Sequence, residues 1–239
     1  FPPRRGAIIV LNELSVDDRE QHVIENESRG AVVFAASAPR AIEMAAEMLR
    51  DGGLVALPTD TVYGVAAAWR QVDALDRLFA VKGRDRAKSI PVLVSSIEAM
   101  DRAGIAVAAD VALLLDQFWP GALTVAIKAP SGTPPALVAA DGTVGVRMPN
   151  HRLAIEVIEK AGGLVACTSA NVSGEDPATS AQDVFAALGA HLEGILDGGR
   201  AYGGVPSTVI GFAGQELIVH RAGAIEVDAI QAVWNEVRA

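Results

Sequence analysis

Apolar positions recur along the chain in two periods, one typical of strands and one typical of amphipathic helices. Apolar, β-prone runs predict strands at residues 31–34, 54–57, 90–94, 123–127, 143–146, 164–167, 208–212 and 217–219. Helical patterns lie between several of these runs, at residues 39–50, 72–81, 109–118, 153–161, 181–188 and 227–237. Strands that alternate with helices predict an α/β fold in which helices flank a twisted sheet.

Two of the predicted strands are apolar at every position. They have the sequences LVAL, at residues 54–57, and LVAC, at residues 164–167. A strand that alternates between apolar and polar residues has one face in water, whereas a strand that is apolar throughout is covered on both faces. We therefore expect helices on both sides of the sheet at these strands.

The first thirty residues differ from the rest of the chain. They contain one short apolar run, at residues 7–11, which we interpret as an appended strand, and a charged stretch at residues 17–27. After Gly30 the alternation is regular, and no repeat or long Pro/Ser-rich linker interrupts it. We expect an N-terminal extension of unassigned role at residues 1–30 and one main domain at residues 31–239.

Composition and charge exclude several classes of protein. Hydrophobic residues make up 51% of the chain and charged residues 21%, which excludes an intrinsically disordered chain. No apolar run reaches the roughly 20 residues that a membrane-spanning helix needs. The net charge of −9 argues against a surface built wholly for nucleic acid, although it allows a local basic site. A single cysteine, Cys167, excludes an intrachain disulfide framework and suits the reducing cytoplasm.

A run of cations follows the predicted helix at residues 72–81. In the sequence KGRDRAKS, Lys82, Arg84, Arg86 and Lys88 alternate with other residues, so that an extended backbone would place them on one face. Such a row suits a polyphosphate, with Lys82 as a solvated cation in a cavity. The alternative is a solvated surface run that complements the dipole of the preceding helix. The run lacks the glycine spacing of a Walker A loop.

Three polar loops adjoin predicted strands, where ligands bind in open α/β sheets. They are PTDTVYG at residues 58–64, TSANVSG at residues 168–174 and GGVPST at residues 203–208. Ser169 and Asn171 could cap a helix or close a turn, but their place directly after an apolar strand favours a ligand site. We expect Cys167 to be a packed residue, since no basic group adjoins it in sequence. The four histidines lack zinc-ligand spacing, and no metal-binding side chains are identified.

Several of these motifs occur in an order that resembles one family. The chain carries PTDTVYG, the KxR pair of KGRDRAKS, WPGALT, VRMP and TSAN, which together resemble the threonylcarbamoyl-AMP synthase family over roughly residues 38–224. The resemblance implies the YrdC-like fold of that family, a twisted open mixed sheet flanked by helices around a concave cationic cavity. It also implies the short, single-domain subfamily, because the chain ends soon after the YrdC-like region.

The resemblance implies a nucleotidyltransferase. Members of the family condense ATP, L-threonine and bicarbonate or CO2 into L-threonylcarbamoyladenylate and pyrophosphate, and Mg2+ is expected to accompany ATP. The product then serves the tRNA threonylcarbamoyl transferase machinery, which modifies adenosine 37 of tRNA. A cytoplasmic location without a membrane partner is expected for such an enzyme.

The resemblance also assigns roles to residues. Lys82, Arg84, Ser169 and Asn171 correspond to a catalytic tetrad that points into the cavity. The residues that would contact ATP are Arg84, Lys88, Thr124, Ser169 and Arg221. The residues that would contact threonine are Thr61, Lys128, Cys167 and Ser207, and Arg147 of VRMP is a further candidate without an assigned role. Three of the four lysines, Lys82, Lys88 and Lys128, are thus expected in the cavity.

Two alternatives remain at this point. The same cavity could bind double-stranded RNA or tRNA without chemistry, in which case binding would weaken steeply with salt. A paralogue of the same fold could instead act on another carbamoyl substrate.

Overall fold

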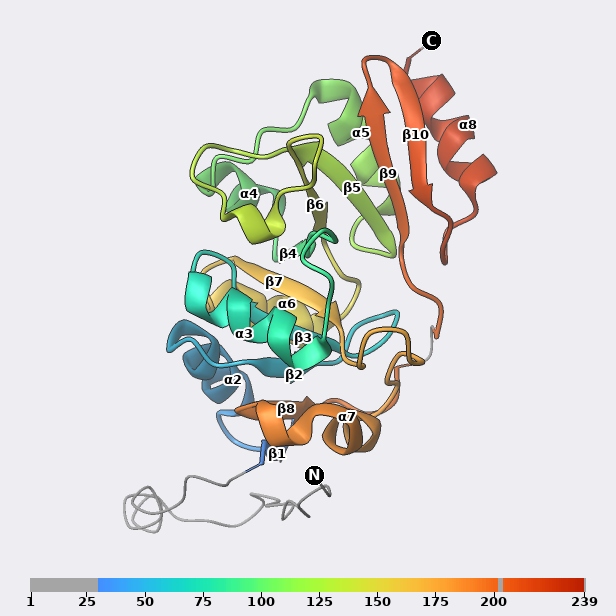
Figure 1. Ribbon diagram of the computed structural model, residues 1–239. Helices are drawn as coiled ribbons and strands as arrows, with labels where there is room; N and C mark the ends of the chain where they lie inside the picture. The colour runs from blue at the N-terminus through green and yellow to red at the C-terminus, as the bar shows by residue number, and fades with distance from the viewer. Residues whose placement is uncertain (1–29, 202–203, 239) are drawn as a thin grey trace.

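The computed structural model describes residues 30–201 and 204–238, which build one mixed sheet of ten strands (Figure 1). The order of the strands across the sheet is β1-β8-β2-β3-β7-β4-β6-β5-β9-β10. Their bounds are β1 (Val32–Ala35), β2 (Val55–Leu57), β3 (Gly64–Ala68), β4 (Val92–Val94), β5 (Leu123–Lys128), β6 (Thr143–Arg147), β7 (Leu164–Ser169), β8 (Gly194–Asp197), β9 (Thr208–Ala213) and β10 (Glu216–Arg221).

The sheet contains both parallel and antiparallel pairs. Strand β8 pairs in parallel with both β1 and β2, and β4 with β6 and β5 with β9 are also parallel. The pairs β2 with β3, β3 with β7, β4 with β7, β5 with β6 and β9 with β10 are antiparallel. The prediction of an open mixed sheet in an α/β fold is confirmed.

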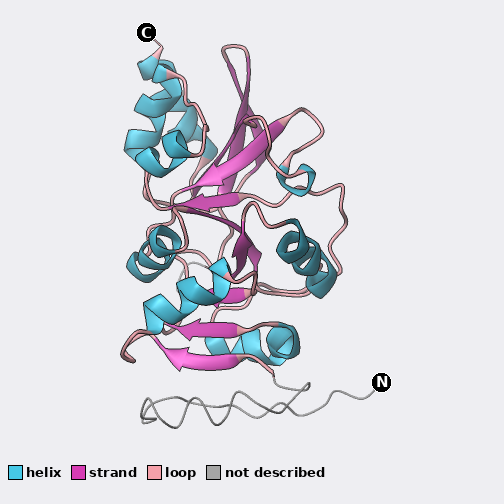
Figure 2. Cartoon of the chain, turned by 90° about the vertical axis from the view of Figure 1, so that its left-hand side faces the viewer, coloured by secondary structure: helices cyan, strands magenta, loops and turns pink. Residues whose placement is uncertain are grey.

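Helices lie on both sides of the sheet (Figure 2). Their bounds are α2 (Ala41–Arg50), α3 (Val72–Lys82), α4 (Ile97–Arg102), α5 (Ala109–Phe118), α6 (Arg152–Lys160), α7 (Ala181–Leu188) and α8 (Val227–Val237). Polar residues fix two of the helix starts. The Ser180 side chain accepts a hydrogen bond from the Asp183 amide in a capping box before α7, and the Ser96 side chain accepts one from Ala99 before α4.

The apolar strands are covered on both faces, as predicted. Around β2, Leu54 and Ala56 belong to the same core cluster as residues of α3 and α7, such as Leu78. Val55 and Leu57 point the other way, into a second cluster with residues of α2 and α6. Because successive side chains of a strand alternate between its faces, a fully apolar strand supplies both clusters.

A third cluster lies at the far end of the sheet, under α5 and α8 (Figure 1). There Leu114 of α5 and Ile230 and Trp234 of α8 pack against Ile210 and Leu217 of the β9–β10 hairpin. This cluster supports the strands that deliver Arg221 and Ser207 to the site described below.

Two strands and one α-helix were not predicted from the sequence. Strand β3 has the sequence GVAAA, strand β8 begins with glycine, and α4 has only six residues. Alanine and glycine have low β propensity, and pairing with two neighbouring strands overrides that preference in both strands. The predicted strand at residues 7–11 lies outside the described residues. Within residues 30–201 and 204–238, no helix is long and apolar enough to cross a membrane.

Candidate active site

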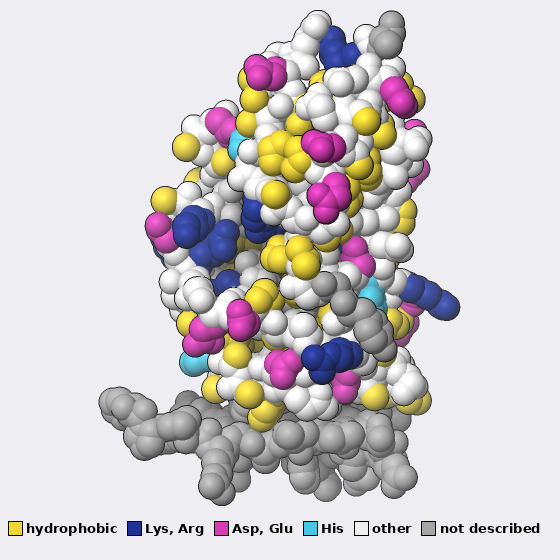
Figure 3. Space-filling model, turned by 90° about the vertical axis from the view of Figure 1, so that its right-hand side faces the viewer, with side chains coloured by type: hydrophobic (Ala, Val, Ile, Leu, Met, Phe, Trp, Pro, Cys, Tyr) yellow, Lys and Arg dark blue, Asp and Glu magenta, His cyan; other side chains and the backbone are white. Residues whose placement is uncertain are grey.

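Two adjoining cavities lie at the strand ends in the middle of the sheet. The first, which we call the arginine cavity, is lined by Arg84, Arg147 and Arg221 together with Thr59, Thr61, Val62, Tyr63, Gly64, Pro91, Leu93, Thr124, Cys167, Thr168, Ser169, Pro206 and Ser207. The second, the lysine cavity, is lined by Lys82, Gly83, Arg84, Asp85, Lys88, Ser169, Asn171, Ser173 and Gly174. Arg84 and Ser169 line both cavities, so the cavities meet at these two side chains. Figure 3 shows Lys and Arg side chains gathered near the middle of one face.

The PTDTVYG loop connects β2 to β3 and contributes buried hydroxyls to the arginine cavity. The Thr59 hydroxyl donates to the carbonyl oxygen of Val62 at 2.6 Å and lies 3.0 Å from the Thr61 hydroxyl. The Tyr63 hydroxyl donates to the carbonyl oxygen of Gly199 at 2.6 Å. Burial raises the pKa of Tyr63 to about 12, and the negative charge of Asp197 contributes to the same shift. The phenol therefore stays neutral and fixes the loop against the segment that follows β8.

Arg147, the last residue of β6, connects this loop to the WPGALT motif. Its Nε atom donates to the carbonyl oxygen of Gly121 at 2.8 Å, and its Nη1 atom donates to the Thr61 hydroxyl at 3.0 Å. Its Nη2 atom forms an ion pair with Asp60 at 2.5 Å. Arg147 is 6% exposed, so the structure places this candidate inside the site, where its guanidinium donates three hydrogen bonds.

Lys82, the last residue of α3, holds the TSANVSG loop. Its Nζ atom donates to the carbonyl oxygen of Ser169, to the carbonyl oxygen of Asn171 at 2.6 Å and to Oδ1 of Asn171 at 3.2 Å. The prediction of a solvated cation is wrong, because the residue is only 2% exposed and its donors bind protein oxygens. Burial, followed by the charge of Arg84, lowers the pKa of Lys82 to about 8. At neutral pH the ammonium therefore keeps its protons and binds all three oxygens.

The cationic run after α3 is not extended. Gly83 has a φ of 57°, a left-handed conformation that ends the helix and turns the chain. Arg86 consequently points to Asp76 and forms an ion pair with it at 2.7 Å on the surface. The prediction that four cations form one row is wrong for this reason, and Arg86 lines neither cavity.

Ser169 and Asn171 have different surroundings in the loop after β7. The Asn171 amide donates to the carbonyl oxygens of Val172 at 3.0 Å and Glu175 at 2.6 Å, which closes the loop. The Ser169 hydroxyl has one contact, with Lys82 Nζ at 3.5 Å, and it lines both cavities. The turn interpretation of this SxN motif is confirmed for Asn171, and the ligand interpretation stays a prediction. Asn171 closes the turn, and Ser169 faces the cavities.

Among the residues described, Arg84 and Arg221 form no ion pair with a carboxylate, although the charge of the adjacent Asp85 acts on Arg84. Arg84 donates to the carbonyl oxygens of Lys88 at 3.0 Å and Ser89 at 2.9 Å, and Arg221 donates to that of Ser207 at 2.8 Å. Burial lowers the pKa of both guanidinium groups, and the charge of a neighbouring arginine lowers it further. Because the arginines repel one another, an anion that binds between them is stabilised.

A β-bulge directs Arg221 into the arginine cavity. In the β9–β10 hairpin Val219 pairs with Ile210, yet Arg221, two residues on, pairs with the adjacent Val209. The extra residue changes the face on which the following side chain lies. Gly223 then allows the chain to pass close to the start of β9, because a Cβ atom there would lie 2.4 Å from the carbonyl oxygen of Pro206.

Thr124, Ser207 and Cys167 complete the arginine cavity. The hydroxyls of Thr124 and Ser207 lie 2.8 Å apart, at the adjoining ends of β5 and β9. Cys167 is buried in β7, and burial raises the pKa of its thiol to about 12. The thiol is therefore neutral and packed, as predicted. A Cβ atom on Gly64 of the neighbouring strand would lie 2.5 Å from Sγ of Cys167.

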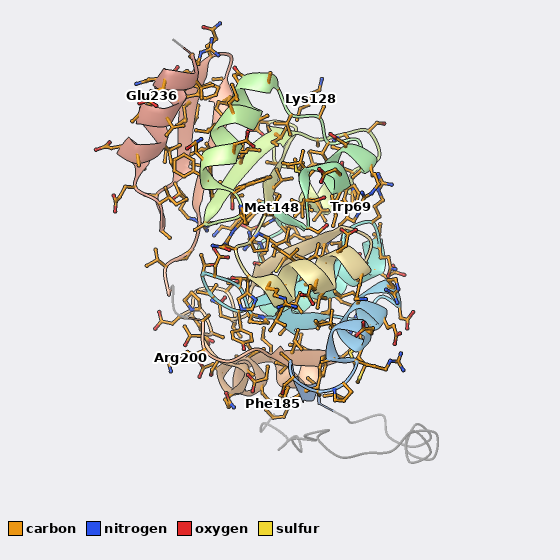
Figure 4. All side chains as sticks on the ribbon, turned by 180° about the vertical axis from the view of Figure 1, so that it is seen from behind. Trp69, Lys128, Met148, Phe185, Arg200 and Glu236 are labelled. Atoms are coloured by element: carbon orange, nitrogen blue, oxygen red, sulfur yellow. The ribbon has the colours of Figure 1, made fainter. Side chains whose placement is uncertain are left out.

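Every site residue predicted from the sequence lines one of the two cavities except Lys128. Lys88 is exposed at the rim of the lysine cavity. Lys128 is also exposed, at the outer end of β5 (Figure 4). The expectation that it lies in the cavity is wrong because Lys128 lies four positions after Thr124 along the strand, a distance of about 13 Å.

Among the polar residues at the site, sequence reasoning did not single out Thr59, which lines the arginine cavity, or Asp60, which pairs with Arg147. Both lie within the PTDTVYG motif, and their position directly after a buried strand was the available signal. Their partners could not be read from the sequence, since Asp60 and Arg147 are 87 residues apart. Among residues 30–201 and 204–238, no group of three or more His, Cys, Asp or Glu side chains is placed to hold a metal ion.

The fold is an open mixed α/β sheet, and the positive charge of the arginines at its strand ends suits an anionic ligand. The chain belongs to the Sua5/YciO/YrdC family, because the model of that family, described as "Telomere recombination", matches residues 47–223.

Similar proteins carry the name of one enzyme. The threonylcarbamoyl-AMP synthase of Pyrococcus abyssi is 34% identical over 197 residues, which cover 82% of this chain and 58% of that protein. The Bacillus subtilis enzyme of the same name is 36% identical over 193 residues, or 80% of this chain and 56% of that protein. The chain thus spans less than two thirds of the length of these relatives. Their names do not favour the alternative of an RNA-binding module.

A solved structure shares the fold. The crystal structure of P. abyssi Sua5 complexed with L-threonine matches 85% of this chain and 60% of that chain, with 32% sequence identity and a TM-score of 0.78.

Proposed function

We propose that this protein is an L-threonylcarbamoyladenylate synthase, which makes its product and pyrophosphate from ATP, L-threonine and bicarbonate or CO2. The observation that carries the proposal is the meeting of two cavities at Arg84 and Ser169. A reaction between two anionic substrates needs two adjoining sites and a cation at the point where they meet. The names of the similar proteins and the bound L-threonine of P. abyssi Sua5 support the same reaction.

The reaction has two bond-forming steps. The amine of threonine attacks the carbon of CO2, a nitrogen–carbon bond forms, and one proton leaves to water. An oxygen of the resulting carbamate then attacks the α-phosphorus of ATP, and the bond to the β-phosphate oxygen breaks, which releases pyrophosphate. Both reactants of the second step are anions, so the site must offset their repulsion and exclude water from the carbamate.

The geometry suggests a division of labour between the cavities. In the arginine cavity, Thr61, Ser207 and the main chain at Cys167 would bind threonine, next to the candidate Arg147. Arg84 at the boundary and Lys88 at the rim of the lysine cavity would bind the phosphates of ATP. Thr124, Ser169 and Arg221 would contact ATP from the arginine cavity. Lys82 and Asn171 would contribute by holding the loop that carries Ser169.

Mg2+ would enter with ATP as part of the substrate. The described residues offer no cluster of three carboxylate, imidazole or thiolate ligands. Phosphate oxygens and water are therefore the ligands we expect for the ion, which would stabilise the charge that develops on pyrophosphate. The side chains of Arg84 and Lys88 would bind the remaining phosphate charge.

The test is an assay of pyrophosphate release with ATP, Mg2+ and bicarbonate, in the presence and absence of L-threonine. We expect release that depends on threonine, and a product with the mass of threonylcarbamoyladenylate. Arg84→Ala should abolish the threonine-dependent release of pyrophosphate. Arg86→Ala, in the same loop, is the matched control. It should retain this activity because Arg86 pairs with Asp76 outside both cavities. Release that does not depend on threonine would contradict the proposal.

The same assay separates the alternatives. A paralogue that acts on another carbamoyl substrate would release pyrophosphate with another amino acid, or with carbamoyl phosphate, better than with threonine. The product of the proposed reaction would supply the tRNA threonylcarbamoyl transferase machinery, and the reducing cytoplasm would suit the free thiol of Cys167.

A further inference from the structure

A chain of polar side chains at the inner end of the arginine cavity fixes the direction of one hydroxyl. It runs from Asp60 through Arg147 and Thr61 to Thr59. We propose that Asp60 and Thr59 are positioning residues that make the Thr61 hydroxyl a hydrogen-bond acceptor for the amine of the amino-acid substrate. This inference rests on the proposed function, because it assumes that an amino acid binds in the arginine cavity.

The first step concerns the single proton of the Thr59 hydroxyl. The oxygen of Thr59 lies 2.6 Å from the carbonyl oxygen of Val62, and two oxygens approach so closely only when a proton lies between them. A carbonyl cannot donate, so Thr59 supplies that proton. The Thr59 oxygen also accepts from the main-chain amides of Thr61 and Val62, at 3.2 and 3.3 Å. Its contact with the Thr61 hydroxyl is shorter, at 3.0 Å, and because the proton of Thr59 is used by Val62, only Thr61 can supply the proton of this contact.

The second step concerns Arg147. A guanidinium only donates, so its 3.0 Å bond to Thr61 uses an acceptor site of the hydroxyl. The hydroxyl of Thr61 has one proton and two acceptor sites. The Thr61 hydroxyl donates its proton to Thr59 and accepts one hydrogen bond from Arg147, so one of its two acceptor sites remains. Because Thr61 lines the arginine cavity, that site is available to a ligand there.

Asp60 holds the guanidinium in the required orientation. Its carboxylate binds Nη2 of Arg147 at 2.5 Å, while the carbonyl oxygen of Gly121 binds Nε at 2.8 Å. Contacts at both sides of the planar group leave Nη1 directed at Thr61. The Asp60 carboxylate also neutralises Arg147, whose charge would otherwise compete with Arg84 and Arg221 for the same anion.

The chemical consequence is a preference for an N–H group at this point of the cavity. An acceptor-only oxygen binds an ammonium or amine and repels a carboxylate. The carboxylate of the amino acid would then lie toward the unpaired arginines. Thr61 would thus set the direction in which threonine binds, and Asp60 and Thr59 would set it through Thr61.

The experiment compares two ligands by calorimetry in the absence of ATP: L-threonine and 3-hydroxybutanoate, which is threonine without its amine. We expect the wild-type protein to bind threonine about 10-fold or more tightly than 3-hydroxybutanoate, as a charge-assisted hydrogen bond implies. Thr61→Val should reduce this ratio toward unity, and Thr59→Val and Asp60→Asn should reduce it as well. Thr59→Ser retains the hydroxyl and should restore the ratio.

Matched controls keep the inference falsifiable. Ser207→Ala removes another hydroxyl of the cavity. It should weaken the binding of both ligands to the same extent, which leaves the ratio of the two affinities unchanged. If Asp60→Asn fails to fold, the Thr59→Val and Thr59→Ser pair still gives the answer. A ratio that is unaffected by Thr61→Val or Thr59→Val would overturn the inference.

The binding experiment is separate from the test of the proposed function. Wild-type protein that discriminates between the two ligands but releases no pyrophosphate would overturn the function and retain the inference. In an active enzyme, Asp60→Asn should raise the KM for threonine and leave the KM for ATP unchanged. If Asp60→Asn lowered the thermal stability without changing the KM for threonine, Asp60 would have only a structural role, and the inference would be overturned.

Discussion

The Nζ atom of Lys82 donates a 2.6 Å hydrogen bond to the main-chain carbonyl of Asn171, 89 residues further along the chain. This bond joins the end of α3 to the loop after β7, and it brings the KxR and SxN motifs together. The ammonium group of Lys82 therefore binds oxygens of the protein itself, and Arg84 is the cation that lines both cavities. The two positively charged residues of one motif have different roles.

The first prediction separates these two roles. Lys82→Ala should lose activity and also lower the free energy of unfolding by about 1–3 kcal/mol, because it leaves buried carbonyl oxygens without a donor. Arg84→Ala should lose activity with a stability change of less than about 1 kcal/mol, because its partners are carbonyls of its own loop. Urea unfolding followed by circular dichroism measures both. Equal stability of the two variants would contradict the assignment.

The second prediction concerns the pH dependence of activity. The pKa of Lys82 is lowered from 10.5 to about 8, so the side chain loses its proton as the pH rises through about 8. A neutral amine has too few protons to bind three oxygens, and we expect the rate of pyrophosphate release to fall there. Lys82→Arg cannot lose its proton in this range and provides the baseline. A wild-type profile that parallels this variant would contradict the prediction.

Stability should change with pH in the opposite direction. The folded pKa of Lys82 lies below the value of 10.5 for the unfolded chain, so the unfolded chain binds more protons between about pH 8 and pH 10.5. The contribution of this group to the free energy of unfolding therefore rises with pH across that window. Comparison of wild type with Lys82→Met, which has no titratable group, isolates it. A difference between the two proteins that falls with pH would show the wrong sign.

A third prediction tests the close approach of β3 and β7. Gly64→Ala should destabilise the protein, because the new Cβ atom would lie 2.5 Å from Sγ of Cys167. Removal of that sulfur in Gly64→Ala/Cys167→Ala should recover most of the loss. Thermal unfolding of the two single variants and the double variant gives the coupling between the sites. Additive losses would mean that the sulfur is not the cause.

The fourth prediction concerns Lys128. Since this side chain is exposed at the outer end of β5, Lys128→Ala should leave the KM for threonine unchanged. Thr124→Val, four residues earlier on the same strand, should impair catalysis, because Thr124 lines the arginine cavity and contacts Ser207. A higher KM for threonine in Lys128→Ala would contradict this prediction and would show that Lys128 contributes to threonine binding.

Local pattern predicted the long elements well and the short ones poorly. The helices α5, α7 and α8 begin and end where their apolar periodicity predicts. The sequence of β8, GILD, has no such signal, and the strand forms because β1 and β2 pair with its two edges. Strand β3 is likewise alanine-rich and is fixed between β2 and β7.

The sequence by itself determined the α/β class, the buried strands and the types of residue at the site, because periodicity and motif chemistry are local properties. Only the tertiary structure decided which motifs meet. It paired Asp60 with Arg147, buried Lys82 under the loop of Asn171, and left Lys128 outside the site. These outcomes depend on strand order, turns and a β-bulge, which bring together groups that are far apart along the chain and carry no mark of one another in the sequence.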